Sequence, residues 1–470
     1  MKTILSALLL FTLANLSFAQ DKVDPKIQEQ NAYKAAIWGM PIVSFDAMRE
    51  AYQRDAKAKY NDIVYWSRPA DSKLQITTPN SSTLYVYLNY NLNNGPIVIN
   101  VPEAKNIGLF GSMNDAWQVP LVDIGPKGED KGKGGKYLLI PPEYKGDIPA
   151  GYINVNALTM NGYAIFRVIP KSFEEKDTKK AVSLIKTIRA YPLAEAVYPP
   201  KQRYIDMAGK EFNGIVTYDS SFFTRLSRMI NEEKIQARDT FAMDQLKTIG
   251  IERGKDFTPD AKAAPMLTNA VKKAQQFFMT AATEMDPYYS GSHWLAPDPT
   301  GPKTGFNFME GDKLAIESRG TLFFLACAPP KNLGAASIYL SQFKDNKDQL
   351  FMGDKNYRLH VPANVPVNQY WSATVYDSET AGFIKDSPKQ TVDSFNKKLA
   401  KNADGSVDIY FGPKAPQGKS ENWIYTQPGK RWFTFFRFYG PEEAIKNKTW
   451  KLPDIESVST NLMQAEEEKP

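Results

Sequence analysis

The chain has 470 residues, of which 42% are apolar and 12% aromatic. This length is more than one hydrophobic core usually serves, and it predicts two or three domains of about 100–200 residues each. The 58 basic and 52 acidic side chains leave a net charge of only +6, and their dispersal argues against the clustered basic stripe of a nucleic-acid-binding protein.

Residues 1–19 have the features of a secretory signal peptide. A charged start at Lys2 precedes an apolar run over 4–13, and Ala19 provides the small residue before the expected cleavage point. The apolar run is too short to span about 30 Å of hydrocarbon, and nothing later in the chain is typical of a transmembrane helix. We therefore expect a periplasmic or secreted protein.

Residues 20–60 predict an N-terminal kinked helix. Apolar side chains recur at helical spacing, so a long amphipathic helix that docks on a sheet is expected. Gly39 and Pro41 interrupt the pattern, and Pro removes a backbone donor and clashes with the preceding turn. A kink or break is therefore expected between Trp38 and Pro41.

Residues 61–180 predict an N-terminal β-sandwich domain. Many short apolar and aromatic runs alternate with Asn-Gly, Gly-Pro and Pro-Pro breaks, which favour a sandwich or barrel. The Gly-rich segment 125–135 precedes a strand-like run rather than a helix, so a hairpin loop is favoured over a phosphate-binding loop.

Residues 181–332 predict a helical insert. Helices are expected over 181–196, 221–250, around Met266 to Ala281, and over 314–328. Between them lies an aromatic loop over 286–308, which is long enough to be a lid or a binding loop. The lone Cys327 cannot form an internal disulfide and is interpreted as a buried structural thiol.

Residues 333–458 predict a C-terminal β-sandwich domain, followed by a polar tail over 459–470. The aromatic run Arg431 to Tyr439 is expected to be a central strand. Arg437 shares a side of that strand with two Phe residues and must find a carboxylate or carbonyls there. Asp377 or Glu442 could supply the carboxylate.

One strand in each β domain divides its side chains between two faces. In the segment 369–377, the residues Trp371, Ala373 and Val375 point one way, while two tyrosines and two hydroxyl residues point the other way. The segment 83–89 repeats this scheme. We expect one face of each strand to be buried and the other to display polar groups in a concavity.

Several motifs resemble a bacterial two-domain family whose parts are known only as domains of unknown function. Thr78-Pro-Asn80 with Thr83-Leu-Tyr85 resembles its N-terminal domain, and Tyr370-Trp-Ser-x-Thr-x-Tyr-Asp377 with Arg437-x-Tyr439 resembles its C-terminal domain. The resemblance covers nearly the whole mature chain. It implies two jelly-roll-like β-sandwiches with helical additions, often exported, and no established catalytic residues. The expected fold is thus mainly β with a helical insert, in which a helical block joins the two sandwiches.

The candidate ligand-binding surface combines aromatic faces with amide, hydroxyl and guanidinium groups, which suit a small polar or glycan-like ligand. Its residues are Asn80, Tyr85, Tyr87, Asn114, Trp117, Tyr370, Ser372, Tyr376, Asn422, Trp423 and Arg437. Asp115, Asp377 and His293 are the catalytic candidates. The two His residues and the one Cys lack metal-ligand spacing, so no zinc site and no cofactor are predicted. A calcium ion bound by carboxylates alone stays open, because Asp and Glu are plentiful.

Three functions compete. The first is a binding protein that holds the polar or glycan-like ligand without chemistry. The second is a hydrolase or lyase that uses a carboxylate pair such as Asp115 and Asp377, at a separation of roughly 5–9.5 Å if it acts on glycosidic bonds. The third is a structural component of the cell envelope that assembles through exposed sheet edges. The oligomeric state stays open.

Overall fold

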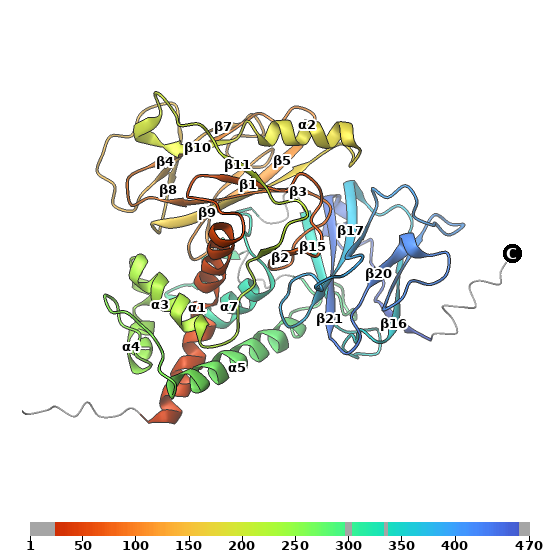
Figure 1. Cartoon of the computed structure of the whole chain (residues 1–470). Helices are drawn as coiled ribbons and strands as arrows, with labels where there is room; N and C mark the ends of the chain where they lie inside the picture. The colour runs from red at the N-terminus through yellow and green to blue at the C-terminus, as the bar shows by residue number, and fades with distance from the viewer. Residues whose placement is uncertain (1–23, 297–302, 333–336, 460–470) are drawn as a thin grey trace, which may run out of the picture.

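The computed structural model describes residues 24–296, 303–332 and 337–459. These ranges leave out the expected signal peptide, most of the polar tail and residues 297–302 of the aromatic loop. Two β halves and a group of helices make up the described chain (Figure 1). The prediction of a mainly β fold with a helical insert is confirmed.

The N-terminal half is a pair of packed sheets. The six-stranded sheet has the order β11-β1-β3-β9-β5-β6, and the four-stranded sheet has the order β10-β4-β7-β8. The bounds are β1 Ile63–Tyr65, β3 Leu84–Asn91, β4 Ile97–Val101, β5 Gly108–Asp115, β6 Pro120–Ile124, β7 Gly135–Ile140, β8 Ile153–Asn156, β9 Asn161–Ile169, β10 Arg189–Pro192 and β11 Tyr204–Asp206. A separate parallel pair joins β2 Leu74–Gln75 to β12 Phe212–Asn213. Helix α2, Glu175–Ile185, and the short turn η1, Leu193–Glu195, complete this half.

Three strands of this half lie beyond residue 180, where the helical insert was expected to begin. Strand β10 pairs antiparallel with β4, and β11 pairs parallel with β1. The expected helix over 181–196 is wrong after residue 185, because Arg189–Pro192 is the edge strand β10. Strand β10 forms because it pairs with a strand roughly 90 residues earlier in the sequence. A local sequence pattern cannot predict such a long-range pairing.

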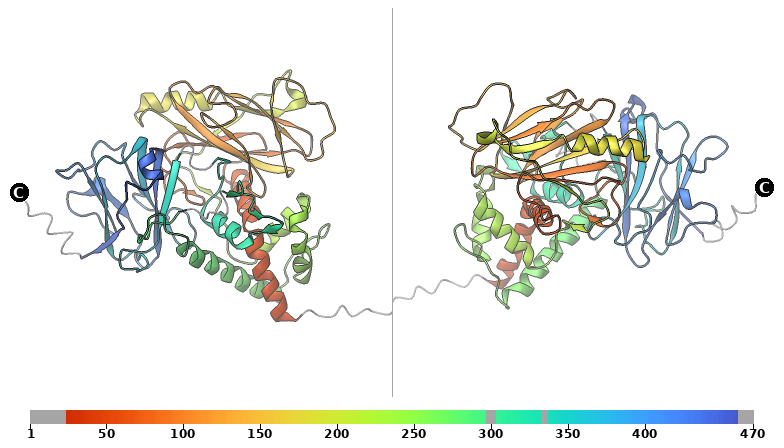
Figure 2. Two further views of the ribbon diagram at one scale, coloured as in Figure 1. Left: turned by 180° about the vertical axis from the view of Figure 1, so that it is seen from behind. Right: turned by 45° about the horizontal axis from the view of Figure 1, so that its top comes forward.

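The helices form a block beside both β halves, as the two views of Figure 2 show. Their bounds are α1 Pro25–Arg54, α3 Ser221–Glu232, η2 Ala237–Asp239, α4 Phe241–Thr248, α5 Ala263–Thr283 and α7 Ile316–Leu325, with a small hairpin of β13 Met309–Glu310 and β14 Lys313–Leu314. The single helix expected over 221–250 is therefore interrupted. None of the described helices combines the length and the apolar composition that a membrane crossing needs.

Helix α1 runs without a break through Gly39 and Pro41. Of the expected kink or break, the break is therefore wrong. The helix is also buried on all sides between residues 35 and 49, rather than amphipathic. A Cβ added at Gly39 would lie 2.8 Å from Leu226 Cδ1, and one added at Gly320 of α7 would lie 2.8 Å from the carbonyl oxygen of Ile37. This close packing from α3 and α7 holds the helix together across the proline.

The C-terminal half is a second pair of sheets, with the orders β15-β21-β17-β18 and β20-β19-β16-β22. The bounds are β15 Ser337–Gln342, β16 Asn356–Val361, β17 Val367–Asp377, β18 Thr391–Asp393, β19 Val407–Gly412, β20 Trp423–Tyr425, β21 Trp432–Pro441 and β22 Glu456–Val458, with η3 Ser420–Asn422 and α8 Glu443–Lys446. The expected central strand is confirmed, because β21 lies between β15 and β17.

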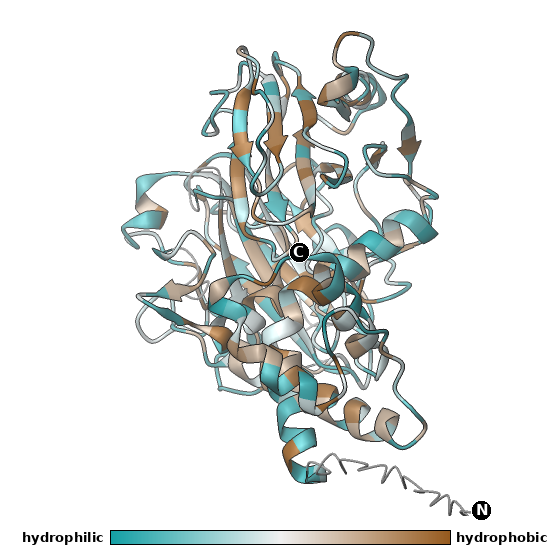
Figure 3. Cartoon of the chain, turned by 90° about the vertical axis from the view of Figure 1, so that its left-hand side faces the viewer, coloured by the Kyte–Doolittle hydropathy of each residue, from teal (hydrophilic) through white to brown (hydrophobic). Residues whose placement is uncertain are grey.

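Three hydrophobic cores follow from the alternation of side chains along the strands, which Figure 3 shows as alternating brown and teal segments. In β3, Leu84, Val86 and Leu88 belong to the core between the N-terminal sheets. In β17, Trp371, Ala373 and Val375 belong to the core between the C-terminal sheets. The opposite faces contribute tyrosines to a third core, which is built around the helices. The polar faces predicted to line a concavity are therefore covered by the other parts of the molecule.

Candidate functional site

The two β halves meet where the segment 76–82 crosses the sheet of β17 and β21. Tyr376 Oη donates to the carbonyl of Pro79 at 2.6 Å, and Tyr370 Oη donates to the carbonyl of Ser82 at 3.2 Å. These hydroxyls satisfy backbone groups that would otherwise be buried without a partner. The two predicted ligand-binding tyrosines therefore join the halves together.

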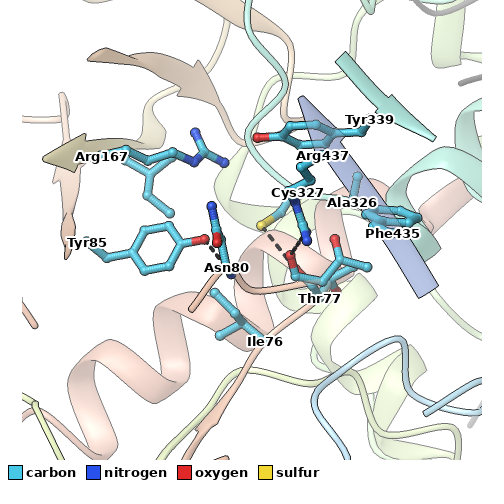
Figure 4. A pocket seen from close by; sticks show the side chains of 12 residues that line it. Ile76, Thr77, Asn80, Tyr85, Arg167, Ala326, Cys327, Tyr339, Phe435 and Arg437 are labelled. Atoms are coloured by element: carbon cyan, nitrogen blue, oxygen red, sulfur yellow. Dashed lines mark hydrogen bonds between the residues drawn. The ribbon is translucent and has the colours of Figure 1, made fainter. Parts of the chain in front are cut away.

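A cavity of about 50 Å³ lies at this junction. Figure 4 shows Arg167 and Tyr85 entering it from one side, and Tyr339 and Cys327 from the other. A volume of this size holds a few water molecules or one small ion. The lining residues are Ile76, Thr77, Thr78, Asn80, Tyr85, Ile165, Arg167, Ala326, Cys327, Tyr339, Phe435 and Arg437.

Two guanidinium groups at the cavity have no acidic partner. Arg437 is only 2% exposed, and its Nη2 donates to the carbonyl of Thr78 at 3.1 Å, while its Nε and Nη1 lack an acceptor. Arg167 is half-buried, and its buried Nε also lacks an acceptor. Within the described ranges, no carboxylate lies at ion-pair distance from either group. The carboxylate partners suggested for Arg437 are wrong, and one carbonyl takes their place.

Aromatic rings surround both guanidinium groups. The Cζ atom of Arg437 lies 4.9 Å from the ring centre of Tyr339 and 5.1 Å from that of Phe435. The Cζ atom of Arg167 lies 5.8 Å from the ring centre of Tyr85. Burial disfavours the charged form of each arginine and acts to lower its pKa. The electrostatic effect of the surrounding tyrosines is larger than that of burial, so the pKa of each arginine lies above its ordinary value. Both side chains therefore remain charged.

A chain of polar groups runs along one wall of the cavity. Asn80 N donates to Tyr85 Oη at 2.9 Å, Asn80 Nδ2 donates to Tyr439 Oη, and Tyr439 Oη lies 3.3 Å from Tyr339 Oη. Burial raises the pKa of Tyr85 and of Tyr439. Burial also acts to raise the pKa of Tyr339, but Arg167 and Arg437 outweigh it and hold this pKa below its ordinary value.

Thr78 holds its carbonyl toward Arg437 through a strained backbone. Its φ is +39°, an unusual value for a β-branched residue. The backbone N–H donates to Ala381 O at 2.7 Å, and Oγ1 donates to Leu325 O at 2.8 Å. Such strain is retained where the surrounding structure fixes a functional geometry.

Cys327 lines the cavity instead of lying in an apolar core. It is half-buried, and its Sγ lies 3.9 Å from the carbonyl oxygen of Thr77. Burial raises the pKa of its thiol to about 11. The thiol is therefore protonated and uncharged at neutral pH, and it adds no negative charge to the site.

The structure brings only part of the predicted ligand-binding set to this cavity. Asn80, Tyr85 and Arg437 line it, and Tyr370 and Tyr376 lie just behind. Arg167, Tyr339 and Cys327 were not in the predicted set. The sequence does contain a pattern that points to Arg167. It shares one face of β9 with the buried Tyr163 and Ile165, at every second position.

The other predicted ligand-binding residues are placed elsewhere. Tyr87 packs edge-on against Tyr52, and Trp117 packs at 5.0 Å against Trp38. Asn114 and Ser372 are fully buried in sheets. Asn422 Nδ2 donates to the carbonyls of Ala400 and Asp408, and Trp423 Nε1 donates to Gly412 O. These last two side chains hold loops of the C-terminal half.

None of the three catalytic candidates lines the cavity. Asp115 is buried, its Oδ1 accepts from Val119 N at 2.8 Å, and burial raises its pKa to about 7. Asp377 accepts from the backbone of Glu379 at 2.7 Å in a turn after β17. His293 lies at a separate cavity of about 130 Å³, with Nδ1 2.8 Å from Asp454 Oδ2.

Comparison with known proteins assigns both halves to families. Residues 60–192 match a protein family described as a protein of unknown function, DUF1254. Residues 336–443 match a second family with the same description, DUF1214. The chain therefore contains two domains of unknown function, one in each half. The resemblance read from the motifs is confirmed. Arg167 lies in the DUF1254 region and Arg437 in the DUF1214 region, so the cavity is built where the two regions meet.

Two solved structures are similar to the chain. The VPA0106 protein from Vibrio parahaemolyticus is 18% identical with a TM-score of 0.53, covering 92% of this chain and 100% of that one. This likeness shows the fold alone. A putative uncharacterized protein from Burkholderia cenocepacia is 11% identical with a TM-score of 0.39, covering 92% and 93%. A search of curated proteins found no match.

Proposed function

We propose that the chain binds a small anionic ligand in the cavity between its two β halves. The observation that carries this proposal is the pair of guanidinium groups, Arg167 and Arg437, which face one cavity without a carboxylate. Guanidinium groups are suited to carboxylate and phosphate groups, because they present several N–H donors in one plane.

The buried position of Arg437 makes its unpaired charge energetically costly. An uncompensated charge in a protein interior carries a desolvation penalty of several kcal/mol, and proteins normally relieve it with an acidic partner. Here a single carbonyl, that of Thr78, accepts a hydrogen bond from the group, and the other neighbours are uncharged rings. A bound anion would supply both the missing charge and the missing acceptors for Nε and Nη1.

The size and the lining of the cavity favour a smaller ligand than the polar or glycan-like one that the sequence suggested. The aromatic rings of the cavity are not an open trough, because Tyr85 is 3% exposed and Phe435 is 8% exposed. The volume favours a small anion over a glycan chain. No Asp or Glu within the described ranges lines the cavity, so these residues offer no carboxylate pair for the alternative hydrolase or lyase.

We also propose that the chain is exported, on the basis of the signal-like residues 1–19. Export predicts that the chain recovered from the periplasm or the medium begins near Gln20. A mass spectrum that shows an uncleaved N-terminus on the folded protein would overturn this.

Thermal unfolding of the purified protein tests the binding proposal. Sodium sulfate, phosphate and formate are each titrated at constant ionic strength. A ligand at a hundred times its Kd stabilises by about 2.7 kcal/mol, which corresponds to a clear rise in Tm. Because sulfate and phosphate also stabilise proteins nonspecifically, the response is compared with that of Arg437→Gln.

Arg253→Gln is the matched control, because Arg253 is exposed and lies outside the cavity. We expect the native protein and Arg253→Gln to share an anion-dependent rise in Tm that Arg437→Gln lacks. Equal responses in all three proteins would show that the cavity binds no anion.

A further inference from the structure

We propose that the preferred ligand is a dianion, such as a tetrahedral oxyanion or a short dicarboxylate, rather than a monoanion. This inference rests on the proposed function and deepens it. It follows from the charges that face the cavity and from the separate origins of the two arginines.

Among the residues that the structure describes, the charged side chains that line the cavity are Arg167 and Arg437, and both are positive. No Asp or Glu of the described ranges is among the lining residues. The remaining polar lining groups are uncharged amides, hydroxyls and the thiol of Cys327. A monoanion would therefore leave one of the two positive charges uncompensated, whereas a dianion compensates both.

The two positive charges come from different halves of the molecule. Arg167 lies on β9 of the N-terminal half, and Arg437 lies on β21 of the C-terminal half. Both guanidinium groups line the same cavity of about 50 Å³, and the Cζ atom of Arg437 lies 4.9 Å from the ring centre of Tyr339, which also lines it. A dianion in this cavity can accept from both guanidinium groups at once.

The uncharged neighbours add donors suited to an anion. Tyr85 Oη already accepts from Asn80 N at 2.9 Å, which leaves its own hydrogen free to donate. Tyr339 Oη points into the same cavity, toward the side from which Arg167 enters (Figure 4). Oxyanions that carry several acceptor oxygens can use these donors together with the guanidinium groups.

In an alternative charge distribution, the ionised phenol of Tyr339 provides a negative charge inside the cavity. If this phenol ionised, the cavity would carry one net positive charge and a monoanion would suffice. An ionised Tyr339 predicts that the cavity binds formate tightly. The dianion proposal predicts that formate binds much more weakly than sulfate, so the two are separable by experiment.

Inorganic phosphate is the sharpest probe, because pH changes its charge without changing its shape. Phosphate gains its second charge between roughly pH 6 and pH 8, since the second pKa of a phosphoryl group lies near 6 and that of free phosphate about a unit higher. Sulfate keeps two charges throughout and reports any change in the protein itself. The measurement is the Kd of each anion by calorimetry at both pH values.

We expect the phosphate affinity, divided by the sulfate affinity, to rise roughly tenfold from pH 6 to pH 8, because the competent dianion fraction rises by that factor. A constant ratio would overturn the dianion proposal. Formate binding as tightly as sulfate would also overturn it while the proposed anion site stands. If no anion binds in the cavity, both proposals fail.

Variants of Arg167 give a second, independent readout. Arg167→Gln removes one charge and should lower the sulfate-to-formate affinity ratio at least tenfold. Arg167→Lys keeps the charge and should keep most of this preference, and Arg253→Gln should not change it. An unchanged ratio in Arg167→Gln would contradict the dianion proposal, even if all affinities fell together.

Discussion

At the scale of single residues, the sequence located Arg437 but not its surroundings. Its place beside two Phe residues on one strand face required a buried guanidinium with partners. The partner is the carbonyl of Thr78, 359 residues away. A local pattern cannot show a contact at this separation. The alternation along β9 indicates that Arg167 lies on a buried face, but it cannot show that this face meets Arg437.

Arg167 tests whether the cavity is built for a ligand or for stability. We find no hydrogen bond or ion pair from this side chain to the described residues. Arg167→Met should therefore leave the free energy of urea unfolding in anion-free buffer unchanged or higher, because an unpaired charge is removed from a partly buried site. The variant should at the same time lose the response to sulfate. A loss of more than about 2 kcal/mol in anion-free buffer would show that Arg167 stabilises the fold.

The raised pKa of Asp115 makes the free energy of unfolding depend on pH. Burial raises its pKa from 3.8 to about 7 in the folded state, so the folded protein holds a proton that the unfolded chain releases between these values. The contribution of this residue to stability is therefore present below about pH 4 and is lost as pH rises to 7. The loss is at most about 4 kcal/mol, at 1.36 kcal/mol for each pKa unit.

Asp115→Asn removes this dependence while keeping an oxygen for Val119 N. Urea unfolding at pH 4, 5.5 and 7 should show little difference from the native protein at pH 4 and a relative gain for the variant at pH 7. Parallel curves for the two proteins would contradict the assigned pKa.

At the scale of elements, alternation along β3 and β17 was predictable because the period of two is a local property of a strand. What covers the second face was not predictable, since it depends on the helices and on the opposite half. Helix α1 illustrates the same limit. Its local sequence suggests a break at Pro41, but packing on all sides keeps it continuous.

The contact between α7 and α1 can be tested at Gly320. An Ala in a helix is normally favoured over Gly by about 1 kcal/mol. Here the added Cβ would lie 2.8 Å from the carbonyl oxygen of Ile37, and backbone cannot move away as a side chain can. Gly320→Ala should destabilise by about 1–3 kcal/mol in urea unfolding. The half-buried Ser318→Ala in the same helix should change stability by less than about 0.5 kcal/mol. A stabilised Gly320→Ala protein would contradict this packing.

At the scale of the whole molecule, the largest core joins both β halves through the helices, and the cavity lies where the halves touch. The family motifs and the two sandwiches could be recognised from sequence because they are local to each half. Their relative placement could not. The site depends on that placement, since one arginine comes from each half.

The most direct test of an anion between the halves is a crystal structure of the protein soaked in selenate, with anomalous data collected at the selenium edge. We expect a selenium peak in the cavity within about 4 Å of guanidinium nitrogens of both Arg167 and Arg437, the distance of an ion pair. The same soak of Arg437→Gln should show no peak there. A cavity without selenium in the native crystal, at a selenate concentration that fills sites elsewhere on the protein, would contradict the proposed function.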